Sequence, residues 1–441
     1  MTISRHGTFT EAFVWTWLPD ETEPVVAGRL GVQGETLVFN YGRSYLAREN
    51  AISLYAPELS LQSGRLSPRP GMRMPGCIRD ASPDAWGRKV TLGRLFGMSG
   101  TTTDTGQADE LTYLLHSGSD RIGALDFQHS ATLFEPRSSG TVSLEELLEA
   151  AERVEKGLAL TPDLDQALHH GTSIGGARPK ALVEDADAKR IAKFASSTDL
   201  YAVLKAEFIA MRLARFCGLD VAAVRMTRAA NKDVLLIDRF DRDFGPDGWR
   251  RKAMVTALTM LELDEMMARY ASYEQFAELI RHRFTNASAT LRELFGRLTF
   301  NILVGNTDDH ARNHSAFWDG RMLTLTPAYD ICPQGRTVQE ASQAMLIQGN
   351  QRLSKLSLCL DAAHLFLLSE ASACNLIGGQ IKAIGSHWRT VCDEAGCGVM
   401  DEKMMWGRQF LNPFAFEDLR GSRSWIRELA EDVRNTPHGQ G

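Results

Sequence analysis

The stretch that decides the fold is Gly305-Asn306-Thr307-Asp308-Asp309-His310-Ala311-Arg312-Asn313. It places an aspartate, Asp308, and an asparagine, Asn313, with four residues between them. A carboxylate can orient an attacking hydroxyl and accept its proton, and an amide oxygen a short loop away can hold Mg²⁺ against phosphate groups. The pair indicates phosphoryl transfer. Alone it is a weak signal, because such pairs occur often by chance.

A second carboxylate follows in Leu325-Thr326-Pro327-Ala328-Tyr329-Asp330-Ile331-Cys332-Pro333. Asp330 comes after a short apolar segment and before a turn that ends in proline. Taken alone, a turn-capping aspartate is the better interpretation. Combined with Asp308 and Asn313, which have the spacing of a protein-kinase catalytic loop, Asp330 is favoured as the second magnesium carboxylate.

A glycine-rich segment lies upstream, in Gly171-Thr172-Ser173-Ile174-Gly175-Gly176-Ala177-Arg178-Pro179-Lys180. Small residues let backbone N–H groups approach phosphate oxygens. The segment is not a Walker A loop, because Ala177 stands where lysine is required, and it is not GxGxxG. Spacing alone leaves a phosphate-binding loop and a plain glycine-rich turn equally open.

A strand lysine and a helix carboxylate form the next candidate pair. Residues 190–195 alternate like a strand with Lys193 in the middle, and a helix is expected from Leu200 to Cys217. Glu207 falls inside the apolar stripe of that helix, which consists of Leu200, Val203, Leu204, Met211 and Ala214. A buried carboxylate needs a partner, so an ion pair with Lys193 is favoured, as kinases use to hold the α- and β-phosphates. The alternative is a Glu207 at the edge of the stripe that meets an arginine or water.

His310 and His314 stand four residues apart, yet no HExxH motif contains them. A structural or phosphate-contacting histidine is therefore preferred over a general base or a metal ligand.

Bulk properties narrow the class of protein. The 441 residues are too many for one core, so two or three domains are expected. The chain shows no signal-peptide pattern and no apolar run of about 18 residues, and its seven cysteines are scattered without a CxxC pair, so a cytoplasmic protein with reduced thiols is expected. A net charge of −6 argues against a protein whose main task is to hold DNA, so DNA is expected only through a partner.

Local patterns predict an α+β chain, β-rich first and mainly helical after Phe244, apart from a loop between about Asn306 and Pro333. Strands are expected at residues 30–32, 36–40, 180–184, 190–195 and 234–237. Helices are expected to start at Ser82-Pro83 and at Ser143, the latter with a capping box to Glu146 and an end at Gly157. The expected domains are 1–140, a small α/β domain without chemistry of its own, 141–245, an ATP-holding lobe, and 246–441, a helical lobe with the catalytic and metal loops.

Together these segments resemble the HipA family of bacterial toxin kinases. The family's markers are matched by five ordered motifs, namely residues 118–125 (GSDRIGAL), 173–181 (SIGGARPKA), 237–242 (IDRFDR), 306–313 (NTDDHARN) and 327–330 (PAYD). The match runs from about residue 25 to 390. The resemblance implies a two-lobed, protein-kinase-like fold with an additional N-terminal domain.

The resemblance also implies roles for individual residues. Asp308 is then the catalytic aspartate, Asn313 and Asp330 bind Mg²⁺, and Ser173 is the site of a silencing autophosphorylation. The residues implied to contact ATP are Gly175, Gly176, Ala177, Lys180, Lys193, Glu207, Asp238, Phe240, His310, Asn313, Tyr329 and Asp330. The chain departs from the family's pattern at Arg312, usually lysine, at Asp238, usually glutamate, and at Arg178-Pro179, usually a more polar pair.

Partners follow from the same resemblance: a small helix-turn-helix antitoxin of the HipB kind, and a protein target, often an aminoacyl-tRNA synthetase. Nothing in the sequence selects the target. Two other hypotheses keep the fold. One is a kinase for a small molecule or lipid hydroxyl, and the other is an inactive kinase fold that serves as the corepressor partner of a DNA-binding antitoxin.

Overall fold

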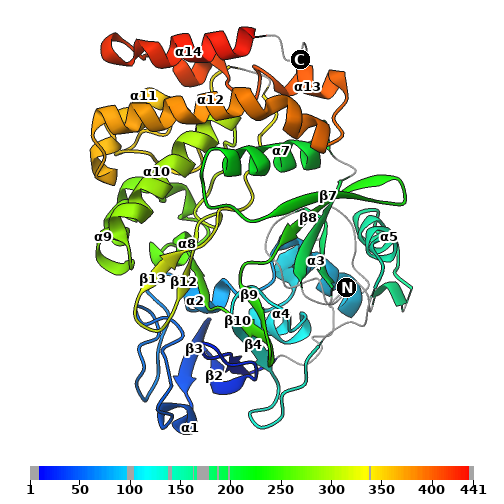
Figure 1. The fold of residues 1–441 in the computed structure, drawn as a ribbon. Helices are drawn as coiled ribbons and strands as arrows, with labels where there is room; N and C mark the ends of the chain where they lie inside the picture. Colours follow the sequence, from blue (N-terminus) through cyan, green and yellow to red (C-terminus); the bar gives the residue numbers. More distant parts are fainter. Residues whose placement is uncertain are drawn as a thin grey trace. The chain divides into compact units, whose positions relative to one another are not determined.

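The computed structural model describes residues 9–96, 104–137, 142–161, 163–165, 178–185, 188–196, 199–336 and 339–436. The chain forms two compact units (Figure 1). Unit 1 consists of Met1–Thr198, Thr227–Val255 and Phe317–Arg321, and unit 2 of Asp199–Met226, Thr256–Ala316 and Met322–Gly441.

Unit 1 begins with an antiparallel sheet of order β3-β2-β1-β4. Its strands are β1 (Glu11–Thr16), β2 (Val25–Gln33), β3 (Thr36–Tyr41) and β4 (Leu125–Gln128). The predicted hairpin is confirmed, with Gly34 at its turn in the left-handed region at a φ of 61°. Gly28 permits the close approach of β2 to β3, because a Cβ there would lie 2.1 Å from the Asn40 carbonyl oxygen.

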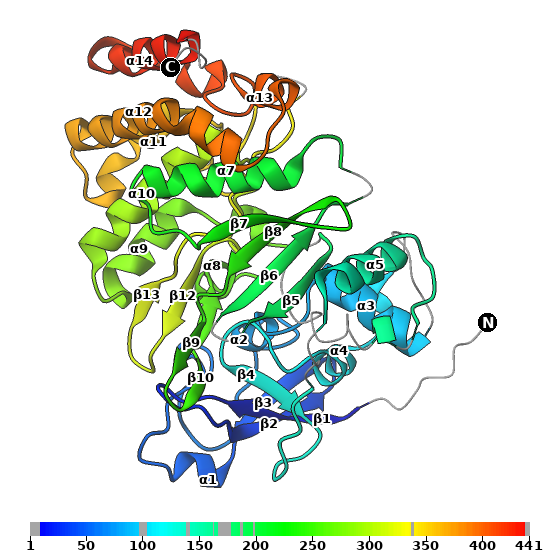
Figure 2. The same ribbon diagram turned by 45° about the vertical axis from the view of Figure 1, so that its right-hand side comes forward.

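A second sheet in unit 1 has the order β5-β6-β8-β7, from β5 (Lys180–Glu184), β6 (Lys189–Phe194), β8 (Lys232–Asp238) and β7 (Val224–Ala229). Helices α3 (Ala85–Phe96) and α5 (Leu144–Glu155) cover one face of it (Figure 2). Trp86, Leu148 and Phe194 are among the buried side chains that join the two layers. The alternate residues of β5 and β6, including Lys180 and Lys193, therefore belong to the other face.

Of the two predicted helix starts in unit 1, one is confirmed and the other is wrong. The capping box of Ser143 and Glu146 is present at the start of α5, and Gly157 follows its end at a φ of 71°. The predicted start at Ser82-Pro83 is wrong. The helix begins at Ala85, and Asp84 caps it by accepting from the Gly87 backbone N–H at 2.8 Å.

The chain becomes mainly helical after Phe244, as predicted, but short strands that were not predicted come first. β9 (Arg242–Gly245) and β10 (Gly248–Arg251) form an antiparallel hairpin, and β11 (Met254–Thr256) follows. The rings of Phe244 and Trp249 pack across the hairpin with centroids 5.0 Å apart.

Unit 2 is mostly helical, as predicted. α12 (Glu370–Glu394) packs against α7 (Val203–Phe216), α10 (Ala287–Val304) and α14 (Ser424–Asn435) (Figure 1). The predicted start of α7 at Leu200 is wrong, since the helix begins at Val203 and Leu200 is 97% exposed.

The remaining helices are α1 (Arg43–Leu46), α2 (Gly76–Arg79) and α4 (Glu110–His116) in unit 1, and α8 (Ala257–Met260), α9 (Tyr273–Arg283), α11 (Leu356–Asp361) and α13 (Val399–Met405) in unit 2. The short 3-10 turns are Thr105–Gln107, Ala268–Tyr270, Ala363–Phe366, Pro413–Phe416 and Gly421–Arg423, and the remaining strands are β12 (Ser315–Trp318) and β13 (Leu323–Leu325). Within the described ranges, no helix is both long and apolar enough to cross a membrane. The predicted division into three domains stays a prediction, and unit 1 takes in most of the first two.

Candidate active site

The loop that carries Asp308 starts where α10 ends. Gly305 closes the helix in the left-handed region at a φ of 69°, and a Cβ there would lie 2.7 Å from the Gln409 carbonyl oxygen. The Gly305 and Thr307 carbonyls then accept from the backbone N–H groups of Gln334 at 2.9 Å and Ala344 at 3.0 Å. These bonds fix the start of the loop on both sides.

Asp308 and Asn313 face each other across a short turn within unit 2. The Asn313 side chain donates from Nδ2 to the Asp308 carbonyl at 3.2 Å, and backbone bonds of 2.9 and 2.8 Å link residues 308, 310 and 313. Oδ1 is the side-chain atom that can bind a cation, because the amide nitrogen is a hydrogen-bond donor only. Asp308 is exposed, whereas Asn313 is buried.

The residue after each of these two is buried and paired. His314 Nε2 lies 3.0 Å from Asp309 Oδ1, and the Tyr273 hydroxyl on α9 donates to Asp309 Oδ2. Burial favours a neutral Asp309, but His314 and these hydrogen bonds hold its pKa below the ordinary value. Burial and the Asp309 charge raise the pKa of Tyr273 well above its ordinary value, so its hydroxyl remains a donor. The Asp309–His314 pair therefore ties the two ends of the Asp308–Asn313 loop together.

Asp330 is held in a sparsely populated backbone conformation, with a φ of 58°. Its neighbour Tyr329 donates from its hydroxyl to the Arg312 carbonyl at 2.6 Å, and the same oxygen lies 2.6 Å from Ser315 Oγ. These contacts bind the Asp330 segment to the loop that carries Asp308. Non-glycine residues with positive φ cluster at functional sites.

The pKa of the Asp308 carboxyl group is shifted by its surroundings in this arrangement. Although the residue as a whole is exposed, partial loss of solvent at its carboxyl group raises the pKa above the ordinary value. The Asp330 and Asp309 carboxylates raise it further, and His310 opposes the rise. A carboxyl with a raised pKa is a better proton acceptor at neutral pH. The Nδ1 atom of His310 is buried, and no described residue gives it a hydrogen-bond partner.

The residues at this site fit a magnesium ion of the kinase type. Nowhere in the described part of the chain do three His, Cys, Asp or Glu side chains gather as a metal site. Mg²⁺ does not need such a cage, because it is held by one or two protein oxygens together with phosphates and water. Asp330 and the Oδ1 atom of Asn313 are oxygen donors of the required type.

The lysines predicted to meet ATP lie in unit 1. Lys180 and Lys193 are direct partners across β5 and β6. Lys180 is only 1% exposed and its Nζ lies 3.1 Å from Asp84 Oδ2, at the N-terminus of α3. Trp86 Nε1 also donates to the Lys180 carbonyl at 3.1 Å. Lys180 is therefore held by Asp84, the residue before α3, and Lys193 is the more exposed of the two lysines.

The matched motif of residues 237–242, which the resemblance to the HipA family makes the adenine-binding hinge, begins at the end of β8. Asp238 is exposed and accepts from Arg190 Nε at 2.7 Å, and the Phe240 ring meets that of Phe317 at a centroid distance of 6.0 Å. Glu207 is 1% exposed on α7, in unit 2, which confirms its predicted burial but leaves its pairing with Lys193 a prediction. Ser173, Gly175, Gly176 and Ala177 lie outside the described residues.

Comparison with known proteins bears on this arrangement. Residues 172–395 match the model of the HipA-like C-terminal domain, and residues 22–128 match that of the HipA N-terminal domain. The chain belongs to the HipA family.

Individual HipA relatives share smaller parts of the sequence. The serine/threonine-protein kinase toxin HipA of Shewanella oneidensis is 28% identical over 141 residues, which are 28% of this chain and 33% of that protein. Matches to the curated relatives span 33% to 39% of their own lengths.

A solved HipA shares the fold. The chain resembles HipA in the complex of HipA, HipB and operator DNA from Shewanella oneidensis, with a TM-score of 0.67, 18% identity, and coverage of 97% of this chain and 100% of that one. The predicted fold class, an α+β protein-kinase-like fold with an added N-terminal α/β domain, is thereby confirmed.

Two residues that hold candidate site residues, one in each unit, were missed by sequence reasoning. Tyr273 holds Asp309 from 36 residues away, and Asp84 pairs with Lys180 from 96 residues away. No local pattern marks Tyr273. Asp84 lay within a segment recognised as a helix start, and a capping aspartate just after Ser82-Pro83 was the available signal.

Proposed function

We propose that the chain is an ATP-dependent serine/threonine protein kinase and the toxin of a toxin–antitoxin pair. It transfers the γ-phosphoryl group to a serine of a protein target, for which an aminoacyl-tRNA synthetase is our proposed class, and thereby arrests growth and promotes persistence. It also phosphorylates its own Ser173. Membership of the HipA family supports this proposal, and so does the grouping of Asp308, Asn313 and Asp330 around one loop.

In the proposed reaction Asp308 orients the acceptor hydroxyl and accepts its proton, a role that its raised pKa favours. Asn313 and Asp330 hold Mg²⁺, which neutralises charge on the phosphates when bound. Lys193, supported by Glu207, contacts the α- and β-phosphates, while residues 175–180 cover them. The backbone of residues 238–240 holds adenine, and His310 and Tyr329 complete the site.

A small helix-turn-helix antitoxin is the proposed partner, in the cytoplasm. The similar HipA of Shewanella oneidensis was solved together with HipB and operator DNA. The net charge of −6 fits a division of labour in which the partner, not this chain, carries the DNA-binding surface.

Intact mass after incubation with Mg²⁺ and ATP tests the proposal. We expect the wild type to gain one phosphoryl group, mapped by peptide analysis to Ser173, and Asp308→Ala to gain none. The matched control is Asp247→Ala, an exposed aspartate at the β9–β10 turn whose nearest cation is 3.9 Å away, and it should behave as the wild type.

Equal phosphorylation of Asp308→Ala would remove Asp308 from the chemistry. If the wild type gains no phosphate and labels no protein in a cell lysate, the kinase assignment is wrong. Growth arrest on expression that Asp308→Ala relieves would separate a toxin from an inert corepressor module.

A further inference from the structure

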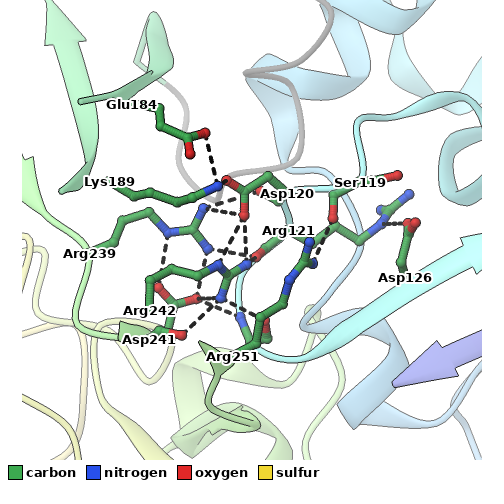
Figure 3. Close-up of polar contacts among 11 residues, drawn as sticks. Ser119, Asp120, Arg121, Asp126, Glu184, Lys189, Arg239, Asp241, Arg242 and Arg251 are labelled. Atoms are coloured by element: carbon green, nitrogen blue, oxygen red, sulfur yellow. Dashed lines mark hydrogen bonds and ion pairs between the residues drawn. The ribbon is translucent and has the colours of Figure 1, made fainter. Parts of the chain in front are cut away.

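A buried ion cluster in unit 1 joins the HipA N-terminal domain to the predicted adenine hinge (Figure 3). We call it the hinge cluster, and it consists of Asp120, Lys189, Arg239, Asp241, Arg242 and Arg251. Asp120 precedes β4 in the N-terminal domain, whereas Arg239, Asp241 and Arg242 follow β8. The hinge cluster thus contains four cations and two carboxylates. The two carboxylates come from segments that are about 120 residues apart in sequence.

Asp241 receives donors from both sides of this junction. Its Oδ2 accepts from the Gly123 backbone N–H at 2.8 Å, from Arg239 Nη2 at 2.8 Å and from Arg242 Nη1 at 2.9 Å. Its Oδ1 accepts from Arg239 Nε at 3.0 Å. The carboxylate therefore fixes two arginine side chains and one backbone group of the N-terminal domain at once.

Asp120, in the N-terminal domain, pairs with the same two arginines. Its Oδ1 lies 3.0 Å from Arg239 Nη1 and 2.8 Å from Arg242 Nη2, and its Oδ2 lies 3.1 Å from Lys189 Nζ. Arg239 and Arg242 therefore each bridge the two carboxylates (Figure 3).

The backbone of the N-terminal domain adds acceptors. Arg239 Nη2 donates to the Arg121 carbonyl at 2.7 Å, and Arg242 Nη1 donates to the Gly123 carbonyl at 2.9 Å. The hinge backbone is also tied to the sheet, since the Arg239 N–H donates to the Lys189 carbonyl at 2.9 Å. The arginine side chains thus contact both Asp241 and the N-terminal domain, while the main chain of residues 238–240 leaves the end of β8.

The cluster is buried and stays charged. The side chains of Arg239 and Arg242 are each 1% exposed. Both carboxylates lose solvent, but the arginines beside them hold the pKa of Asp120 well below its ordinary value and lower that of Asp241 to about 2. Loss of either carboxylate would leave the buried Arg239 and Arg242 to share the single carboxylate that remains, which is unfavourable.

We propose that Asp120 is a positioning residue for nucleotide binding: through Arg239 and Arg242 it fixes the main chain of residues 238–240, so that the N-terminal domain forms part of the support of the adenine site. This rests on the proposed function for its consequence, but the positioning itself does not depend on it. Asp120 touches no substrate in this scheme.

The test compares Asp120→Asn with Glu110→Gln in the full chain. Glu110 is a matched control because it is a partly buried carboxylate of the same domain, with a side chain 28% exposed against 21% for Asp120, and it pairs with Arg88 at 2.6 Å, outside the hinge cluster. Both changes keep the side-chain shape and remove one partly buried charge. Both should lower the denaturation temperature.

Hydrogen exchange of the nucleotide-free protein gives the first readout. We expect peptides covering residues 236–242 to exchange roughly tenfold faster in Asp120→Asn and to stay within about twofold of the wild type in Glu110→Gln. Equal exchange in the two variants, whether raised or unchanged, would overturn the proposal, because the cluster would then be a generic stabiliser.

Phosphotransfer kinetics give the second readout. We expect the KM for ATP to rise roughly tenfold in Asp120→Asn with kcat within about twofold, because a hinge contact contributes equally to the ground and transition states. A fall in kcat at unchanged KM would overturn the link to the nucleotide. A wild type that binds no ATP would refute the proposed function, while the exchange experiment would still decide the positioning role.

Discussion

The Tyr273 hydroxyl donates to Asp309, so its removal measures how much this contact stabilises the loop that carries Asp308. Tyr273→Phe removes one oxygen from a fully buried ring and leaves no cavity, because the ring itself is retained. The hydroxyl donates to the ionised carboxylate of Asp309 and also lies 3.2 Å from His314 Nε2, so the change removes both contacts while His314 stays 3.0 Å from Asp309. A hydrogen bond to a buried charged group contributes about 1.5–3 kcal/mol, so we expect the free energy of unfolding to fall by about 2 kcal/mol.

Urea unfolding followed by circular dichroism measures this change, and the m-value should stay constant. Tyr113→Phe is the matched control, since its hydroxyl donates at 2.6 Å to the neutral carbonyl of Thr105. A bond to a neutral acceptor contributes about 1 kcal/mol, so the control should cost about half as much.

A double-mutant cycle with Asp309→Asn isolates the charged interaction. If the hydroxyl acts through the carboxylate, Tyr273→Phe should cost about 1 kcal/mol less in the Asp309→Asn background. Additive costs, or a cost no larger than that of Tyr113→Phe, would refute the idea that Tyr273 stabilises the loop through the Asp309 charge.

Three further changes should be measurable by the same unfolding assay. Gly305→Ala should destabilise unit 2 by about 1–3 kcal/mol and lower phosphotransfer, because it strains a φ of 69° and drives a Cβ to 2.7 Å from the Gln409 carbonyl oxygen. Asp241 has its pKa lowered to about 2 in the folded state, so its contribution is complete above about pH 5 and is lost as the pH falls towards 2. The stability difference between wild type and Asp241→Asn should shrink over that window, and a constant difference would contradict the assignment. Ser143→Ala should cost about 1 kcal/mol through loss of the α5 capping box, and no measurable cost would show that the box is not stabilising.

Sequence reasoning succeeded where the signal was local. The capping box of Ser143 and Glu146, the strand at residues 180–184 and the hairpin around Gly34 each depend on neighbouring residues, and the structure confirms them. The grouping of Asp308 and Asn313 was predictable for the same reason, since five positions of a tight loop bring them together.

It failed where distant residues decide. The sequence of the β9–β10 hairpin is mostly polar and did not indicate strands. Its Trp249 ring packs against Lys189 of another strand, β6, with Nζ 5.2 Å from the ring centroid. Leu200 matched a helical stripe, but the helix starts after it, and nothing local distinguishes an exposed leucine from a buried one. Asp120 and Arg242 were both inside recognised motifs, but their contact across 122 residues has no signature in either.

The residues of the hinge cluster lie far apart in the sequence, so the ribosome synthesises them at different times. Asp120 and the Gly123 amide leave the ribosome before their partners Arg239, Asp241 and Arg242 exist, and a gap of 118 to 122 residues separates them. At a translation rate of about 5–20 residues per second, the nascent N-terminal domain waits roughly 6–24 seconds for its counter-charges. During that interval Asp120 must remain hydrated. The N-terminal domain therefore reaches its final structure only after the segment that carries Arg239, Asp241 and Arg242 has begun to fold.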